Sequence, residues 1–469
     1  MDYKKKLHYL NPEKESKKVE IHLTKTKIRE LSISSKDNER MVREQLAKKV
    51  SGTYIGLWLL IAEHIRLGTW DLLKSWTGKE DREIEPHLAM QIVNESALCV
   101  TGVRIRNSLS CQGFEVLNGL PYISTDKSIH ELLDEHTISE SKAMQIALGK
   151  LRQVRGDYRS NKFAFDPHRI YTFSKRVMPL KKSNPKNISK KNLQAFFCID
   201  VITGQPVGFM IGSSGKTTSR ASLELLDMME SIIPDGGLIM ADTEHATVEI
   251  LKKFYETENY EILMPLPRNK KLIAHLKQLE YEKKWAGYGF ATTDYEFGKM
   301  EHAISLIAQR TGEIETDYQY KGFASSFSHP NKDALEMITE DYPERWTIEE
   351  FFNFEASMGW NRISTMNLNI SYGKMSLALI AQAVTHQFRK KLPKPYSNWT
   401  AKHLADTIFH GIDGDLRVKN DTIIVTMYNV PEKLNLRKHY EHLPEKLEKE
   451  GIDPRIPWLF NFKVDFRFK

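Results

Sequence analysis

The chain has 469 residues, of which 41% are hydrophobic and 10% aromatic, and its formal net charge is +7. This composition excludes an intrinsically disordered chain, and no apolar run reaches the roughly 18 residues that a membrane-spanning helix needs. The three cysteines are odd in number and widely spaced, which excludes a disulfide framework and gives no zinc-site spacing.

The first third of the chain is basic at its start and then helical in pattern. Met1–Arg29 mixes charged and polar residues without the central apolar block of a signal peptide, so we expect a cytoplasmic protein. Apolar residues recur at helical spacing in Asn38–Lys49, Gly52–Trp76 and Ser139–Arg155. No strand pattern interrupts these segments convincingly, and we expect a helical region up to about residue 155.

From Lys162 the pattern changes to short strands. Phe163–Phe165 predicts a strand that ends at Asp166, and a Lys-rich loop follows it. The next elements are a strand, a hairpin turn, a return strand, a helix and a buried strand that ends at Asp242; their ranges are Ala195–Ile199, Asp200–Gly204, Pro206–Ile211, Ser219–Ile233 and Gly237–Ala241. This order fits an α/β sheet in which the first and fourth strands lie parallel.

Two acidic residues follow apolar strands in this sheet. Asp166 and Asp242 are each the first polar residue after the strand, and ligands gather at the carboxyl ends of such strands. Asp200 competes for the first position because it also follows an apolar strand, but its place in a hairpin turn favours Asp166. Each aspartate also has a purely structural alternative: Asp166 as a turn residue before Pro167, and Asp242 as an ordinary strand-end or helix-capping residue.

The second half of the chain begins with further short strands. Residues from about 255 to 330 predict a β-rich insertion, and helix resumes near Pro343, a residue suited to a first helical turn. On that helix, Tyr342, Arg345 and Glu349 share one stripe. Taken alone, Arg345 and Glu349 indicate only a surface ion pair worth about 0.3–0.5 kcal/mol. The tail from about residue 395 contains a predicted hairpin at Leu416–Tyr428.

The stretch from Tyr342 to Phe352 resembles the third-carboxylate region of insertion-sequence DDE transposases. That region reads Tyr, two residues, Arg, three residues, Glu, six residues, Lys. Tyr342, Arg345 and Glu349 match in type and spacing, whereas Ala356 stands at the Lys position. The segments that end in Asp166 and Asp242 also look like the first-Asp and second-Asp strands of this family.

The resemblance implies an α/β fold, namely a ribonuclease-H-like mixed sheet with a β-rich insertion and a helical N-terminal domain. The expected domains are a helical DNA-binding and dimerisation region, a catalytic domain interrupted by the insertion at about 255–330, and a small C-terminal segment; their ranges are 1–155, 156–392 and 393–469.

The implied function is that of a DNA transposase, which cleaves phosphodiester bonds at element ends and then joins the freed 3′-hydroxyl to target DNA. Asp166, Asp242 and Glu349 are then catalytic and hold two Mg²⁺ or Mn²⁺ ions, since carboxylates supply the hard oxygen ligands that in-line phosphodiester cleavage requires. Further residues are expected to contact DNA or support the site, namely Tyr342, Arg345, Lys175 and Arg176. The expected partners are terminal inverted repeats, target DNA and a second copy of the chain, without a membrane, in a nucleoid-associated protein.

Two alternatives stay open. One is a DDE-fold protein that binds DNA but has lost or repurposed catalysis. The other is a nucleotide hydrolase, because Gly212–Thr217 follows a strand and opens a helix as a phosphate loop does, although its first glycine is out of register. We expect the histidines near the motif segments to be surface or packing residues; they are His168, His245 and His329.

Overall fold

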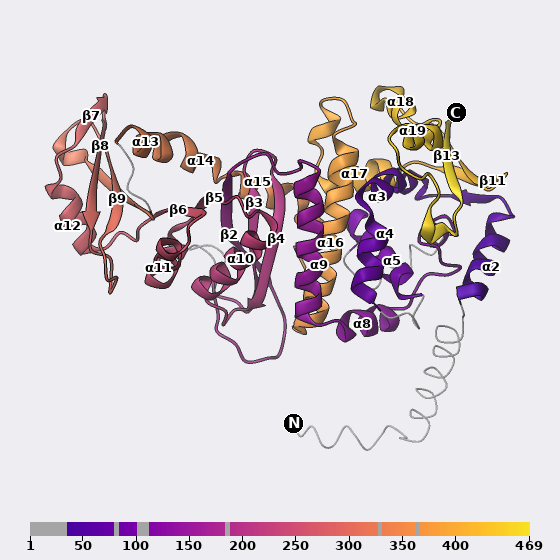
Figure 1. Ribbon diagram of the computed structural model, residues 1–469, viewed down its shortest axis with the longest axis horizontal. Helices are drawn as coiled ribbons and strands as arrows, with labels where there is room; N and C mark the ends of the chain where they lie inside the picture. Colours follow the sequence, from indigo (N-terminus) through magenta and orange to yellow (C-terminus); the bar gives the residue numbers. More distant parts are fainter. Residues whose placement is uncertain (1–34, 79–83, 101–111, 183–187, 327–330, 363–364) are drawn as a thin grey trace, which may run out of the picture.

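A computed structural model describes residues 35–78, 84–100, 112–182, 188–326, 331–362 and 365–469 (Figure 1). Within these residues, nine strands form one sheet in the order β4-β3-β2-β5-β6-β10-β9-β8-β7. Strands β2 to β5 span Lys162–Tyr171, Asn192–Asp200, Gln205–Ser213 and Gly237–Ala241. Strands β6 to β10 span Tyr260–Pro265, Glu282–Trp285, Tyr288–Tyr295, Ile304–Thr311 and Gln319–Ser325.

The pairing of these strands confirms the predicted parallel neighbours. β2, β3 and β4 pair antiparallel in sequence order, whereas β5 pairs parallel to β2 on one side and parallel to β6 on the other. β5 has the bounds that the sequence predicts, and the β3–β4 hairpin turns where the sequence predicts it. The chain therefore contains a large mixed sheet.

The first strand is longer than its sequence pattern indicates. β2 does not end at Asp166 but runs to Tyr171, because it keeps its pairing with β3 as far as Tyr171↔Asn192. Its pairing with β5 stops earlier, at Phe165↔Ala241. Polar residues such as His168 and Arg169 in the second half of β2 conceal this extension from an apolar-strand pattern.

Alternation along the strands gives the first part of the sheet two buried faces. Phe163, Phe165 and Ile239 belong to the core shared with α10 (Thr218–Ile232) and α11 (Val248–Glu256). Ala164 and Met240 belong to the core on the opposite face, with α15 (Thr347–Glu355) and α16 (Leu368–Arg389). Because side chains alternate with a period of two, residues of even number in this part of β2 and β5 point toward α15 and α16.

The predicted β-rich insertion continues the same sheet. β10 pairs antiparallel with β6 and with β9, and β8 and β7 complete the outer edge. The helix α12 (Lys270–Gln278) buries Leu272 and Leu276 in this part. The side chain of Asn269 caps its first turn by accepting a hydrogen bond from the backbone N–H of Leu272. Figure 1 shows these strands and α12 at the end of the molecule away from the helices of the N-terminal region.

The first third of the chain forms mainly helices, several of which pack against α16. Their bounds are Ser35–Leu46 (α2), Ile55–Leu60 (the 3-10 helix η3), Ile61–Leu67 (α3), Thr69–Thr77 (α4), Glu85–Ala97 (α5), Gln112–Leu117 (α7), Asp126–Glu135 (α8) and Ile138–Val154 (α9). α9 begins with a capping box in which Thr137 and Glu140 satisfy each other's backbone N–H groups. Figure 1 shows α9 and α16 side by side, with α4 and α5 beyond them.

The expectation of an uninterrupted helical region is wrong at one point. Val50–Gly52 forms a short strand, β1, whose partner is β11 (Gly414–Lys419), near the other end of the chain. A second sheet follows in the order β1-β11-β12-β13, with β12 at Thr422–Met427 and β13 at Lys463–Phe468. The predicted C-terminal hairpin is confirmed as β11 and β12, and the short helices α17, α18 and α19 span Ala401–Leu404, Leu436–Tyr440 and Leu443–Lys449.

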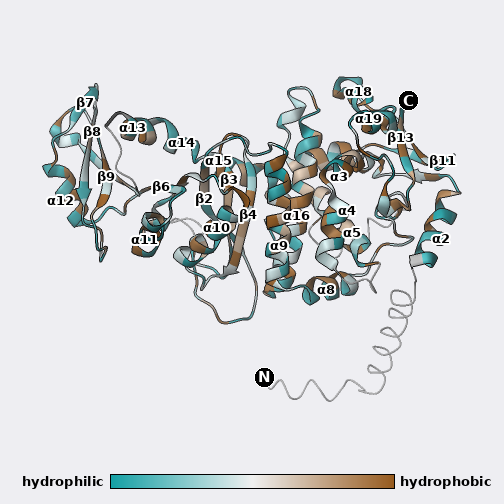
Figure 2. Cartoon of the chain, in the orientation of Figure 1, coloured by the Kyte–Doolittle hydropathy of each residue, from teal (hydrophilic) through white to brown (hydrophobic). Residues whose placement is uncertain are grey.

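The helical segment that carries the third carboxylate starts earlier than Pro343. α13 (Asn331–Glu336) leads through a π-helical turn at Met337–Asp341 into α14 (Tyr342–Glu344), and α15 follows after a break at Arg345 and Trp346. Figure 2 shows mainly hydrophilic residues on α14 and α12, and apolar residues along α16. Of the helices in the described residues, none combines the length and the apolar character needed to span a membrane.

Candidate active site

The sheet register brings Asp166 and Asp242 together. They follow Phe165 and Ala241, the last paired residues of the parallel strands β2 and β5. Both have even numbers and therefore share the face of the sheet that α15 and α16 cover. Their side chains are 19% and 34% exposed, respectively, so both carboxylates remain within reach of solvent.

An aromatic cluster holds α15 against this face. The ring of Phe197 on β3 lies 5.6 Å from Phe351 and 5.4 Å from Phe352, and Phe351 also packs against Trp360 at 5.4 Å. Phe351 and Ile348 are buried, as the apolar stripe of the predicted helix requires. This packing fixes the position of α15 and with it that of Glu349, whose side chain is 34% exposed.

Arg345 links two of the three carboxylates. Its Nη1 lies 3.6 Å from Asp166 Oδ1, and its Nη2 donates to Glu349 Oε1 at 3.2 Å. The guanidinium is only 14% exposed, and its Nη1 makes no hydrogen bond within the described residues. Tyr342 lies beside it and donates its hydroxyl to the carbonyl of Ala241 at 3.2 Å, which ties α14 to the end of β5.

Asp242 is oriented by two donors. The backbone N–H of Glu244 donates to Oδ1 at 2.8 Å, and His245 Nδ1 lies 3.1 Å from the same oxygen. Both contacts are made to Oδ1. Burial alone would raise the pKa of Asp242, but the hydrogen bonds from His245 and Glu244 and the charges of His245 and Arg345 outweigh it and lower the pKa below its usual value.

His245 is buried, with 1% exposure, which agrees with the packing role expected of it as one alternative. It also contacts the predicted catalytic carboxylate of Asp242, which its sequence pattern did not predict. The short 3-10 turn Thr243–His245 after β5 makes this contact possible, because it returns the third residue toward Asp242. A signal was present in the sequence as a histidine three residues after the strand-end aspartate.

Burial and neighbouring carboxylates both disfavour the ionised form of Asp166. Burial raises the pKa of Asp166 to about 7, and the charges of Asp242 and Glu349 act in the same direction, while Arg345 opposes them. The neighbouring carboxylates and the Tyr342 hydroxyl in turn hold the pKa of Arg345 above its usual value, against the effect of burial. Further positive charge would therefore be favoured beside Asp166.

The donor set fits divalent cations in its chemistry. Asp166, Asp242 and Glu349 supply hard oxygen ligands, and the one cation now between two of them is a guanidinium. In the described parts of the chain, however, no group of three or more His, Cys, Asp or Glu side chains stands close enough to enclose a metal ion. Binding of a cation here thus requires the carboxylates to turn from Arg345 toward a common centre.

The predicted basic residues lie apart from the carboxylates. Lys175 and Arg176 are exposed in the loop after β2, where Arg176 Nη1 donates to the carbonyl of Met366 at 3.1 Å. Closer to the site, Arg169 on β2 forms an ion pair with Glu244, beside Asp242. Position 356, where the resembled signature has Lys, is a half-buried alanine at the end of α15.

Two rival motifs have structural roles. Asp200 is fully buried, and its carboxylate accepts the backbone N–H groups of Arg159 and Ser160 and both donors of Thr203, as expected of a turn residue. Lys216, in the predicted phosphate-loop segment, donates to Glu224 at 2.9 Å.

Of the two other histidines near the motifs, only His168 lies within the described residues. His168 lies within hydrogen-bonding distance of the carbonyl of Trp360, with its Nε2 at 2.9 Å, and stacks on Phe352 at 4.4 Å, in line with its expected packing role. His329 lies outside the described residues.

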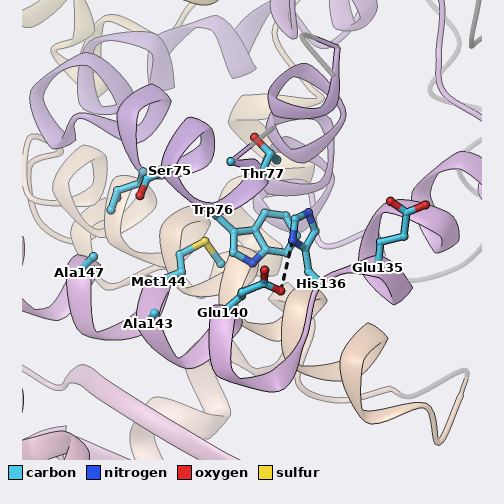
Figure 3. Close-up of a pocket in the computed structure, with 11 residues that line it drawn as sticks. Ser75, Trp76, Thr77, Glu135, His136, Glu140, Ala143, Met144 and Ala147 are labelled. Atoms are coloured by element: carbon cyan, nitrogen blue, oxygen red, sulfur yellow. Dashed lines mark ion pairs between the residues drawn. The ribbon is translucent and has the colours of Figure 1, made fainter. Parts of the chain in front are cut away.

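A pocket of about 390 Å³ lies in the helical part and not at the carboxylates. Figure 3 shows Trp76 of α4 against His136, with their ring centroids 4.1 Å apart, and Glu140 of α9 beside them. His136 Nδ1 and Glu140 Oε2 are 3.8 Å apart. The pocket contains no predicted site residue, so its shape gives no information about the predicted chemistry.

One family model matches the region that carries the carboxylates. Residues 157–383, slightly under half of the chain, match a family described as the transposase DDE domain. No curated protein matches the chain. Among solved structures, the chain is similar to the piggyBac transposase in a synaptic complex with hairpin DNA, with 12% identity, 77% of this chain and 82% of that chain covered, and a TM-score of 0.40. The family match over residues 157–383 supports a DDE transposase.

Proposed function

We propose that the protein is a DNA transposase that cleaves DNA at element ends and joins the freed 3′-hydroxyl to a target strand. The observation that carries this proposal is the parallel register of β2 and β5, which sets Asp166 beside Asp242 on the face where α15 presents Glu349. The match to the transposase DDE domain includes all three residues. Three carboxylates from distant parts of the chain thus lie near Arg345 at one sheet edge, and a turn toward a common centre would give the ligand set that phosphodiester chemistry requires.

The strand order supports a ribonuclease-H-like catalytic domain over residues 156–392. Three antiparallel strands are followed by two parallel ones in the order β4-β3-β2-β5-β6, with helices on both faces. The β-rich insertion then adds its strands beyond β6. In the proposed division, the N-terminal region, residues 1–155, and the C-terminal segment, residues 393–469, flank this domain, and the pairing of β1 with β11 joins them.

Asp166, Asp242 and Glu349 are the residues that would hold two divalent cations, Mg²⁺ or Mn²⁺. Such cations activate an attacking oxygen and stabilise the leaving oxygen in phosphodiester cleavage. The two hydrogen bonds to Asp242 Oδ1 fix that carboxylate so that Oδ2 is left to act as a ligand. When the carboxylates turn inward, the Arg345 guanidinium is released to bind a DNA phosphate, to which its forked donors are suited.

The proposed reaction has two stages at one site. A water molecule first attacks the phosphodiester at the element end and frees a 3′-hydroxyl. That hydroxyl then attacks a target-strand phosphate, and one phosphodiester forms as another breaks. Tyr342 and Arg345 position the strand beside Glu349, and Lys175 and Arg176 bind phosphates farther along the DNA. The proposed partners are therefore terminal inverted repeats and target DNA, bound by a homodimer that pairs the two ends.

The experiment compares Glu349→Gln with Glu350→Gln. Both substitutions remove one carboxylate from α15, but Glu350 is an exposed residue outside the site. The substrate is a supercoiled plasmid that carries the reading frame with its natural flanking DNA, in Mg²⁺ buffer. We expect nicking to fall at least about 100-fold in Glu349→Gln and to persist in Glu350→Gln. DNA binding by the wild type without any nicking would instead identify a repurposed DNA-binding protein.

A further inference from the structure

The connection between β2 and β3 extends from the same end of the sheet as the carboxylates. β2 continues five residues past Asp166 to Tyr171, which pairs with Asn192 at the start of β3. We call the described residues 172–182 and 188–191 of this connection the basic loop. Because β2 carries both the carboxylate and this loop, DNA bound at the carboxylates can run along β2 to reach it.

Hydrogen bonds hold the backbone of the basic loop at several points. Lys191 Nζ donates to the carbonyls of Ser174 and Arg176 at 3.1 and 2.6 Å. Ser214 Oγ donates to the carbonyl of Pro179 at 2.6 Å, and the backbones of Lys181 and Lys190 exchange two hydrogen bonds of 2.9 Å. The described parts of the loop therefore present their side chains from a backbone that is tied down at both ends.

Four large apolar side chains on this fixed backbone are exposed to solvent. Phe173 and Val177 are fully exposed, Ile188 is 79% exposed and Leu180 is 59% exposed. Large apolar residues that stand exposed together mark a surface that another molecule covers. The two fully exposed residues flank Lys175 and Arg176, so apolar and cationic groups alternate along one short stretch.

The positive charge of the basic loop indicates which kind of molecule binds it. The loop contains six Lys or Arg residues and no Asp or Glu. The same loop of a second copy would be repelled by this charge, whereas the phosphates of a nucleic acid would be attracted to it. DNA whose bases are unstacked or displaced matches both kinds of side chain, because its phosphates are anionic and its exposed base faces are apolar.

We propose that the basic loop is a DNA-distorting element: Phe173 and Val177 press against bases where the duplex is opened, and Lys175 and Arg176 bind the flanking phosphates. Apolar side chains inserted at base steps are a known way for proteins to hold unstacked DNA. This role rests on the proposed DNA transposase function, and it assigns the loop to the recognition of opened DNA near the cleavage point.

The test uses the double variant Phe173→Ser/Val177→Ser and the control Ile202→Ser. Ile202 is 64% exposed in the β3–β4 turn, at the opposite end of the same sheet. Because all three side chains lie in solvent, we expect the thermal unfolding midpoints of both variants to equal that of the wild type. The probes are two duplexes of one sequence, one fully paired and one with a nick, each with 2-aminopurine at the same step.

We expect the wild type and Ile202→Ser to raise the 2-aminopurine fluorescence of the nicked duplex and to bind it more tightly than the paired one. Phe173→Ser/Val177→Ser should lose most of the fluorescence rise and about tenfold in affinity for the nicked duplex, while it binds the paired duplex normally through phosphate contacts. Equal fluorescence and affinity in the double variant and the wild type would overturn the proposal.

Two further outcomes are distinguishable. If the double substitution changes the sedimentation of the free protein and leaves both DNA measurements unaltered, the loop contacts a second copy and the proposal is overturned. If the wild type binds neither duplex, the proposed transposase function is overturned together with the role of the loop.

Discussion

His245 and Asp242 are joined across a single 3-10 turn, with His245 Nδ1 3.1 Å from Asp242 Oδ1 and the histidine almost fully buried. The backbone N–H of Glu244 shares the same oxygen. The carboxylate is thus held in one orientation by groups that never need to touch DNA.

The first prediction concerns this contact. His245→Gln should weaken the binding of Mn²⁺ by about 10- to 100-fold, because second-shell partners that orient a ligand have effects of this size. Mn²⁺ titration followed by the unfolding midpoint measures it. His302→Gln, at an exposed histidine, serves as the control. A titration midpoint equal to that of the wild type would show that the histidine does not support Asp242.

The second prediction concerns the cation at the carboxylates. Arg345→Gln removes the guanidinium that now pairs with Asp166 and Glu349 and leaves their repulsion unopposed. We expect the metal-free variant to lose about 1–3 kcal/mol of unfolding free energy at pH 8, and to regain more than the wild type does when Mg²⁺ is added. Urea denaturation with and without Mg²⁺ measures this, and Arg362→Gln is the exposed control. An identical Mg²⁺ effect in variant and wild type would contradict it.

The third prediction follows from the raised pKa of Asp166. In the folded protein this pKa is raised to about 7, whereas in the unfolded chain it is about 3.9. The folded state therefore holds the proton more tightly, and this adds to the unfolding free energy. The contribution is complete below about pH 3.9 and is lost as pH rises through 7. Asp166→Asn removes the cost of ionisation. The metal-free variant should therefore exceed the wild type in stability by up to about 4 kcal/mol at pH 8 and by less than half of that at pH 5.

The same variant tests metal binding without an activity assay. Mg²⁺ should stabilise the wild type at pH 8 and leave Asp166→Asn nearly unchanged, because the substitution removes an anionic ligand. A pH-independent difference in unfolding free energy between the two proteins would refute the assignment of the raised pKa to Asp166.

The fourth prediction concerns acid stability of the helical part. His64 and His87 are buried, and burial is the main cause that lowers the pKa of each to about 4. Their contribution to stability is present above the unfolded pKa of about 6.5 and is lost as pH falls through 4. Between pH 6.5 and 5, each histidine should lower the unfolding free energy by roughly 2 kcal/mol, because it takes up a proton in the unfolded chain but stays neutral in the folded protein.

Urea denaturation at pH 7 and pH 5 measures this loss. His87→Gln should reduce the difference between the two pH values, and His302→Gln should leave it unaltered. If His87→Gln loses as much unfolding free energy between pH 7 and pH 5 as the wild type does, the effect of this buried histidine is ruled out.

The sequence could predict the central strands because their patterns are local. Gly237–Ala241 is an uninterrupted apolar run with a glycine before it and Asp242 after it, and the structure has a strand with these bounds. The approach of Asp242 to Asp166 then follows from the parallel pairing of two such strands, which the order of elements already indicates.

Other features depend on partners that are distant in the sequence. Val50–Gly52 is a strand only because Leu416 and its neighbours in β11 lie beside it. The second half of β2 contains polar residues and is held extended by β3. The position of Glu349 relative to Asp166 is set by aromatic packing on Phe197 and by Arg345, which spacing along α15 alone does not specify.

In the proposed site, Asp166, Asp242 and Glu349 surround common divalent cations. Replacement of Mg²⁺ by Fe²⁺, followed by ascorbate and peroxide, cuts a protein backbone close to the bound ion. We expect cuts near residues 166, 242 and 349 together, and we expect excess Mg²⁺ to suppress them and Asp242→Asn to lose all three. Cuts confined to one of these segments, or three that persist in Asp242→Asn, would contradict this arrangement.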